Sequence, residues 1–288
     1  MMSMMESTSV ARSTSSQSST PTIELRGVTK QFRTPSGGLY TALRDLSLSI
    51  QPGEFVAVVG PTGSGKSTTL GLIAGLERAT GGEVFVMGQP VQGINPRVGF
   101  VFQTDAVFPW KSVLGNVAAG PRFRGVRGHE AQRQARDWIA RVGLAGFEDR
   151  YPHQLSGGMR KRVSLAQTLI NEPQILLMDE PFSALDVQTR ILMGNELLSL
   201  WSSTSASVVF VTHDLEEAIA LADRVIVLTA GPATVKGSYP IDLPRPRNVT
   251  EIRFDPRFVE LYHTIWEDLR SEVMISYERA KQQGDGQS

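Results

Sequence analysis

The chain contains no cysteine among its 288 residues. A disulfide framework, a thiolate metal site and a cysteine nucleophile are therefore excluded, and a cysteine-free chain suits a reducing cytoplasm. Net charge is lacking too, because 29 lysine and arginine residues balance 29 aspartate and glutamate residues. Nucleic-acid binding requires a concentrated positive surface, so we expect no nucleic-acid partner.

Long apolar runs are also missing. None approaches the roughly 18 residues that a membrane-spanning helix requires, and the longest, such as residues 207–212, have the length of a strand. Residues 1–20 are dominated by serine and threonine and lack the basic and apolar regions of a signal peptide. We expect this segment to be a disordered tail.

Short apolar segments in the remaining sequence predict the strands of a sheet. Alternating patterns at residues 22–25 and 42–50 are typical of strands with one buried face. Further strands are expected at residues 84–87, 98–102, 175–178, 208–212 and 225–228. The last four are almost continuously apolar, which is typical of strands that are covered on both faces.

The most informative segment is a glycine-rich turn between a predicted strand and a predicted helix, the context that a phosphate-binding loop requires. Its residues are Gly60, Pro61, Thr62, Gly63, Ser64, Gly65, Lys66 and Ser67, and Thr68 follows in the helix. Glycines permit a tight turn whose backbone N–H groups converge on phosphate oxygens. We expect Lys66 to neutralise the β- and γ-phosphates and the Ser67 hydroxyl to bind Mg²⁺.

A pair of carboxylates follows the apolar strand at residues 175–178. Asp179 can reach Mg²⁺ through its water shell, and Glu180 can act as a general base that polarises an attacking water. On its own, such a pair can equally be a solvated charge in a loop. The phosphate-binding loop upstream favours the catalytic interpretation.

A second anion-binding turn precedes a predicted helix at residues 159–170. It consists of Leu155, Ser156, Gly157, Gly158 and Met159. A serine with two glycines at a helix N-terminus can bind an anion, although by itself it can also be a simple cap. With these motifs in this order, the chain resembles the ABC ATPases, whose signature motif is similar to LSGGQ. In that family two copies enclose two ATP molecules head to tail.

The resemblance extends over about residues 22–230 and implies an α/β fold. This is the ABC ATPase fold, a P-loop NTPase core with a mainly parallel sheet, an antiparallel β subdomain and an inserted α-helical subdomain. We place the ATPase domain at residues 21–230 and its helical subdomain at about 104–170, where residues 129–142 show helical spacing.

Residues 231–288 are expected to form a C-terminal extension with an amphipathic helix. The apolar stripe of this helix can pack in the core or bind a partner. The stripe consists of Phe258, Leu261, Tyr262, Ile265, Leu269 and Val273.

Other residues match ABC motifs one by one. Phe32 matches the aromatic residue that stacks on adenine, with Tyr40 as a second candidate and a core position as the alternative. Gln103 matches the Q-loop glutamine, which contacts Mg²⁺ and the attacking water, and His213 matches the switch histidine that binds the γ-phosphate. The D-loop, which crosses the dimer interface, corresponds to Ser183, Ala184, Leu185 and Asp186.

Three positions depart from the family pattern. Met159 replaces the glutamine of the signature, and Lys161 and Gln167 stand where family members often have glutamine and arginine. Ser156 and Gly158 are retained, so we expect neither nucleotide binding nor hydrolysis to be impaired.

The motif inventory favours a separate motor subunit. One phosphate-binding loop and one signature, without spanning helices or a sustained heptad repeat, are typical of importers whose ATPase docks on separate membrane subunits. The resemblance implies ATP hydrolysis with Mg²⁺ by a homodimer, integral-membrane permease subunits, and an indirect periplasmic or extracellular substrate-binding protein. It places the chain peripherally at the cytoplasmic face of the inner or plasma membrane. The alternative is a soluble regulatory or repair ABC ATPase that is not coupled to transport.

The segment after Gln103 narrows the family further. Phe108 and Trp110 flank a proline, and together with residues 116–117 and 243–247 they resemble the nitrate/sulfonate/taurine importers. Trp110 then either docks on the permease or fills the core of the helical subdomain. The transported compound binds a different polypeptide. The resemblance therefore implies only a class of substrate, a small anion such as nitrate, sulfonate or taurine.

Overall fold

A six-stranded sheet forms the centre of the computed structural model, which describes residues 20–35 and 37–285. In spatial order its strands are β10 (Val235–Pro240), β9 (Arg224–Leu228), β3 (Phe55–Val59), β8 (Ser207–Val211), β7 (Ile175–Asp179) and β6 (Val98–Val101). The five strands from β9 to β6 are parallel, and β10 pairs antiparallel at one edge. The tail predicted at residues 1–20 lies, apart from Thr20, outside the described residues.

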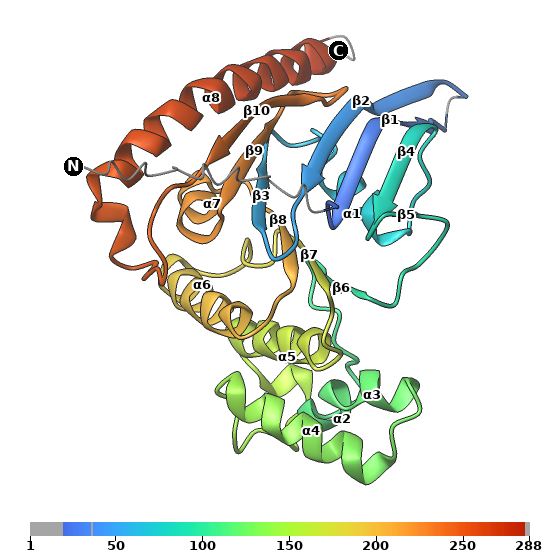
Figure 1. Cartoon of the computed structure of the whole chain (residues 1–288), viewed down its shortest axis with the longest axis vertical. Coiled ribbons are helices and arrows are strands. Elements are labelled where there is room, and N and C mark those ends of the chain that lie inside the picture. Colours follow the sequence, from blue (N-terminus) through green and yellow to red (C-terminus); the bar gives the residue numbers. More distant parts are fainter. Residues whose placement is uncertain (1–19, 36, 286–288) are drawn as a thin grey trace, which may run out of the picture.

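A second, antiparallel sheet lies beside the first (Figure 1). In spatial order its strands are β2 (Leu39–Ile50), β1 (Ile23–Arg33), β4 (Gly81–Val86) and β5 (Gln89–Pro90). In the pair β1–β2, Ile23 lies opposite Ile50 at one end and Phe32 lies opposite Tyr40 at the other. The predicted combination of a mainly parallel and an antiparallel sheet is therefore confirmed.

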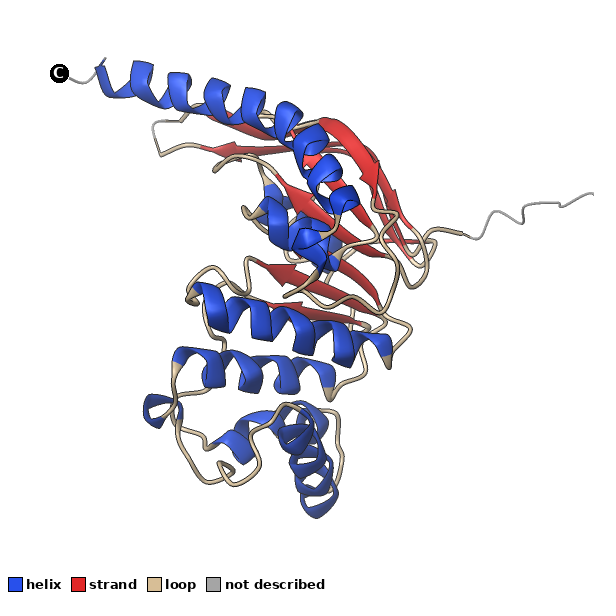
Figure 2. Ribbon diagram, turned by 90° about the vertical axis from the view of Figure 1, so that its left-hand side faces the viewer, coloured by secondary structure: helices blue, strands red, loops and turns tan. Residues whose placement is uncertain are grey.

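The helices divide into those that cover the sheets and those that form a separate lobe. They are α1 (Lys66–Ala74), α2 (Val113–Val117), α3 (Ala119–Phe123), α4 (Gly128–Arg141), α5 (Gly157–Leu169), α6 (Val187–Ser202), α7 (Leu215–Leu221), α8 (Pro256–Asp285) and the short 3₁₀ turns η1 (Pro152–Gln154) and η2 (Ile252–Phe254). Helices α2, α3 and α4 project away from both sheets (Figure 2). No helix in the described part of the chain combines the length and the apolar character needed to cross a membrane.

Alternation along β3 separates two cores. Phe55, Ala57 and Val59 belong to the core that α6, α7 and α8 share with the central sheet. Val56 and Val58 belong to the other core, which contains α1 and the antiparallel sheet. A strand buried on both faces must be apolar at every position, which is why this strand could be recognised from its sequence.

Helix α8 packs its predicted stripe against the first of these cores. Phe258, Leu261, Ile265 and Leu269 are buried there, so the core interpretation of the stripe is confirmed for them. Val273, in contrast, is 39% exposed, because the stripe leaves the core before this residue. Helix α8 continues to Asp285 along the edge of the molecule (Figures 1 and 2).

A buried arginine fixes the segment that leads into α8. The Arg247 guanidinium donates hydrogen bonds to the carbonyl oxygens of Ala222 (2.6 Å), Ile219 (3.3 Å), Leu243 (3.0 Å) and Ile241 (3.2 Å). Burial lowers the pKa of Arg247 to about 10, which leaves it charged at neutral pH. This single side chain therefore joins the extension to the C-terminal end of α7.

We expect Arg247→Met to destabilise the protein by about 2–4 kcal/mol, because methionine fills the space but leaves buried carbonyl groups without donors. Denaturant unfolding measures the change. Arg133→Met is the control, since Arg133 is 71% exposed and forms only a surface pair with Glu130, so its cost should stay below about 0.5 kcal/mol. Equal stability of the two variants would contradict the anchoring role.

Candidate active site

The predicted phosphate-binding loop joins the C-terminal end of β3 to α1. Gly65 has a φ of 76°, and a Cβ atom at this position would lie 2.5 Å from Leu43 Cδ2. Both the left-handed backbone and the close approach require glycine. Helix α1 begins at Lys66 without a side-chain cap, so its first N–H groups are available to an anion.

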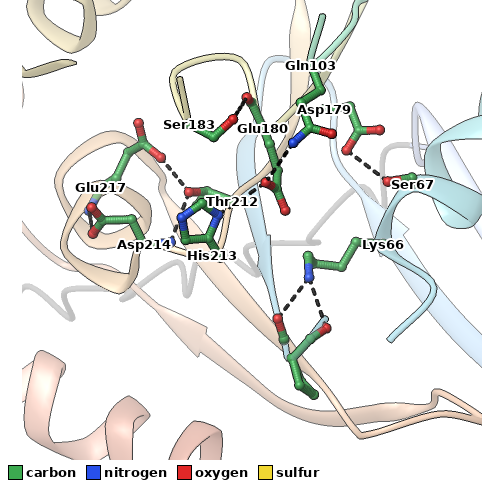
Figure 3. A network of polar contacts seen from close by, with 12 residues as sticks. Lys66, Ser67, Gln103, Asp179, Glu180, Ser183, Thr212, His213, Asp214 and Glu217 are labelled. Atoms are coloured by element: carbon green, nitrogen blue, oxygen red, sulfur yellow. Dashed lines mark hydrogen bonds and ion pairs between the residues drawn. The ribbon is translucent and has the colours of Figure 1, made fainter. Parts of the chain in front are cut away.

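Lys66 lies folded into this loop. Its Nζ donates to the carbonyl oxygens of Gly60 (2.8 Å) and Pro61 (3.0 Å), as Figure 3 shows. Burial lowers the pKa of Lys66, while the carboxylates of Glu180 and Asp179 oppose that change. The ammonium group is therefore bound by loop carbonyl oxygens, and a phosphate oxygen can take their place.

An oxygen-rich pair lies at the end of β7. The Ser67 hydroxyl donates to Asp179 Oδ1 at 3.0 Å, and burial raises the pKa of Asp179 despite this hydrogen bond. A hydroxyl and a carboxylate are the ligand types that Mg²⁺ prefers, together with water and phosphate oxygens. The donor set at this point therefore fits Mg²⁺.

The three predicted catalytic side chains meet at one carboxylate oxygen. Glu180 Oε2 lies 3.1 Å from His213 Nδ1 and 3.4 Å from Gln103 Nε2. Glu180 has a φ of 42°, and its backbone is held on both sides, by its own N–H donating to Val211 O and by Ser183 Oγ donating to its carbonyl. The left-handed turn directs the carboxylate toward His213 (Figure 3).

These residues face a common cleft of about 670 Å³. This volume is within the range of ligand sites. The described residues that line it are Phe32, Tyr40, Ala42, Thr62, Gly63, Ser64, Gly65, Lys66, Ser67, Thr68, Gln103, Glu180 and His213. Both adenine candidates are thus present, and Tyr40 is the more exposed of the two.

The signature and the D-loop lie next to each other, outside the lining of this cleft. Ser156 caps α5 by accepting from the N–H of Met159 at 3.3 Å. A Cβ atom at Gly157 would lie 3.7 Å from Leu185 of the D-loop. Asp186 caps α6 by accepting from both the N–H and the hydroxyl of Thr189, which lowers the pKa of Asp186.

Lys161, which in the sequence is only a departure from the family pattern, joins two segments of the structure. The residue is 3% exposed. Its Nζ pairs with Asp105 Oδ1 at 3.1 Å and donates to the carbonyl oxygens of Phe102 and Gln103. Lys161 therefore joins α5 to the segment that carries Gln103. The sequence signal is weak, because Asp105 is distant from Lys161 along the chain and neither belongs to a recognisable motif.

The hydrogen bonds that flank His213 were not predicted from the sequence either. Thr212 Oγ1 donates to Glu217 Oε2 at 2.5 Å and accepts from the N–H of Asp214 at 3.0 Å. Asp214 accepts from the N–H of Glu217 and pairs with Arg190 at 2.9 Å. Burial raises the pKa of Glu217 to about 7. The available signal was Asp214 followed three residues later by Glu217, the spacing of a helix N-terminus.

Comparisons with known proteins agree with this geometry. A model of the ABC transporter family matches residues 43–183. An uncharacterized ABC transporter ATP-binding protein of Methanocaldococcus jannaschii is 45% identical over 88% of this chain and 93% of that protein. A taurine import ATP-binding protein of Jannaschia sp. is 38% identical over 88% of this chain and 96% of its own length. A nitrate import ATP-binding protein of Synechococcus elongatus is 40% identical over 88% and 93%, respectively.

A solved structure is similar as well. It is the dimer of an ATP-binding cassette in a post-hydrolysis state bound to ADP and Pi, with a TM-score of 0.69 and 33% sequence identity over 77% of this chain and 100% of that chain. The sheets, the loop before α1 and these relatives lead to one conclusion. The chain belongs to the ABC transporter family as one of its ATP-hydrolysing, ATP-binding cassettes.

Proposed function

We propose that this ATPase is the motor subunit of an importer for a small anion such as nitrate, sulfonate or taurine. The observation that carries the catalytic part is the meeting of Glu180, His213 and Gln103 beside the phosphate-binding loop. The import assignment is supported by relatives named for taurine and nitrate import. A repair ATPase is less favoured, since the charge of the chain is balanced.

Each part of the site has a role in ATP hydrolysis. Backbone N–H groups of residues 60–68 bind the phosphates, and Lys66 exchanges its carbonyl partners for phosphate oxygens. Phe32, or Tyr40 in its place, stacks on the adenine. Ser67, Asp179 and Gln103 would hold Mg²⁺, which neutralises phosphate charge when it is bound.

The hydrolytic step uses the carboxylate of Glu180. Its Oε2 accepts a proton from the attacking water as the new bond to the γ-phosphorus forms and the bond to ADP breaks. His213 donates a hydrogen bond to the γ-phosphate, and its contact with Glu180 fixes the two side chains relative to each other. The hydrogen bonds around Thr212 and Asp214 hold the backbone of this histidine.

We further propose that two copies complete each other's sites. Ser156 is exposed at the start of α5 and does not line the cleft of its own chain. The exposed N-terminus of α5 suits the phosphates of a second chain's ATP. Residues 183–186 lie against the signature and would then cross the same interface. The similar cassette solved as a dimer supports this arrangement.

The surface after Gln103 is our candidate for binding the permease. Trp110 is 71% exposed, so the core interpretation of this residue is wrong. Its ring lies 5.7 Å from that of Phe108, and the Lys111 ammonium group lies over the rings of both Phe108 and Phe123, of which Phe123 is 76% exposed. Exposed aromatic groups are typical anchors of protein interfaces. Docking here would place the chain at the cytoplasmic face of the membrane, with the substrate-binding protein contacting only the permease.

We expect Glu180→Gln to bind ATP and Mg²⁺ but to hydrolyse ATP about 10²–10⁴-fold more slowly, because the amide cannot accept the proton. Steady-state phosphate release measures the rate, and equilibrium binding measures the affinity. Glu172→Gln, an exposed position before the opposite end of β7, is the control. Turnover of Glu180→Gln close to that of the wild type would reject Glu180 as the base.

Mixing two inactive variants tests the shared sites. Lys66→Ala and Ser156→Arg should each be inactive alone, whereas their heterodimer has one site with both lesions and one site with neither. With random exchange, half of the dimers are mixed, so about a quarter of the wild-type turnover should return. If heterodimers form and turnover stays at background at every ratio, independent head-to-tail sites are contradicted.

We expect Trp110→Ala to weaken copurification with the permease at least about tenfold, as loss of a central aromatic anchor does, and to leave the melting temperature unchanged. Phe254→Ala is the matched control, because Phe254 is an aromatic residue of similar exposure, at 79%, but belongs to η2. A lower melting temperature with intact permease binding would contradict the docking role.

A further inference from the structure

The distal part of α8 holds the loop between β9 and β10, residues 229–234. Glu272 Oε2 accepts a hydrogen bond from the N–H of Ala230 at 2.9 Å, and its other oxygen pairs with Lys236 at 3.2 Å. About two turns further along α8, Arg279 donates to the carbonyl oxygen of Gly231. Two side chains of one helix thus fasten two consecutive residues of the loop.

Glu272 is unusual among the charged residues of α8. It is 5% exposed, and no other acidic residue in the described part of the chain is as little exposed. Burying a carboxylate is unfavourable unless its partners are fixed, and both of its oxygens have one. The carboxylate therefore holds Ala230 and Lys236 in one defined arrangement.

The same loop lies against the phosphate-binding loop. A Cβ atom at Gly231 would lie 3.3 Å from Gly63 O and 3.5 Å from the Tyr40 hydroxyl, and that hydroxyl itself donates to Gly63 O at 3.4 Å. At the start of the phosphate-binding loop, a Cβ atom at Gly60 would lie 3.1 Å from Leu228 O. The end of β9 and the loop after it therefore support the nucleotide loop along its side.

Backbone hydrogen bonds also join the β9–β10 loop to β2. The N–H of Ala233 donates to Ala42 O at 2.9 Å, and the N–H of Arg44 donates to Ala233 O at 3.0 Å. Ala42 lines the nucleotide cleft, and Leu43 packs against Gly65. A shift of the β9–β10 loop would therefore move both the phosphate-binding loop and β2, the strand that carries Tyr40.

We propose that α8 acts as a latch on the nucleotide site. By this we mean that Glu272 and Arg279 are positioning residues, which hold the β9–β10 loop and through it the residues that bind ATP. The inference rests on the proposed assignment of residues 60–68 to ATP. Both side chains act on residues 60–68 indirectly. Glu272 acts through Ala230 and Arg279 acts through Gly231. Because linked equilibria are reciprocal, bound nucleotide must in turn hold the distal end of α8 more firmly.

The test measures binding of a non-hydrolysable ATP analogue to the full chain by calorimetry. We expect Glu272→Ala and Arg279→Ala to raise the Kd about fivefold or more, within the range of mutations that act on a site through intermediate residues. Glu272→Gln keeps an acceptor for the N–H of Ala230 and should restore most of the affinity. Amide exchange should show that the analogue protects residues 270–279 in the wild type and not in Glu272→Ala.

Two kinds of control distinguish a latch from a general loss of stability. Ile265→Ala removes a fully buried contact of α8 with the core, so it should lower the melting temperature but leave the Kd within about twofold. Arg270→Ala and Glu278→Ala alter exposed positions of the same helix and should leave both unchanged. Arg279 is itself exposed, so its variant tests the latch even if Glu272→Ala does not fold.

The outcomes separate this inference from the proposed site. Lys66→Ala must lose the analogue if residues 60–68 bind ATP, and wild-type affinity in that variant would overturn the site itself. If Lys66→Ala loses binding while Glu272→Ala and Arg279→Ala retain wild-type affinity, the latch is rejected and the site stands. A Kd raised equally by Ile265→Ala, or no rescue by Glu272→Gln, would also reject the latch.

Discussion

The parallel pairing of the central strands is the constraint on which the rest of this structure depends. In a parallel sheet the carboxyl ends of all strands share one edge, so whatever follows each strand meets at that edge. The loop before α1 follows β3, Asp179 ends β7 and Glu180 follows it, and His213 follows β8. Because β3 lies between β8 and β9, the loop at residues 60–68 is next to His213 on one side and the β9–β10 loop on the other.

The polar and charged groups at this edge form hydrogen bonds with one another and with the backbone. Lys66 contacts loop carbonyls, Ser67 contacts Asp179, and Glu180 is shared by His213 and Gln103. Each of these contacts occupies a group that phosphate, Mg²⁺ or water would bind during hydrolysis. The site is therefore held in shape by internal hydrogen bonds that a nucleotide and its metal can replace with contacts between opposite charges.

The C-terminal extension is joined to both sides of the nucleotide site. Arg247 binds carbonyl groups at the end of α7, the helix that follows His213, and Glu272 binds the loop beside Gly63. Between these points the buried stripe of α8 packs against the core. Through buried polar anchors, a segment remote from the catalytic motifs contacts the elements that position them.

The sequence by itself determined the fold class and predicted the loop at residues 60–68 and the site residues Gln103, Asp179, Glu180 and His213, because contiguous motifs and apolar strands are local properties of the chain. It did not reveal β10, whose alternation includes glycine and proline, nor the exposure of Trp110. Only the tertiary structure decided the roles of Lys161, Arg247 and Glu272, whose partners are distant in sequence. Such a role arises when folding buries a charge beside particular backbone groups, and no local pattern of residues encodes that encounter.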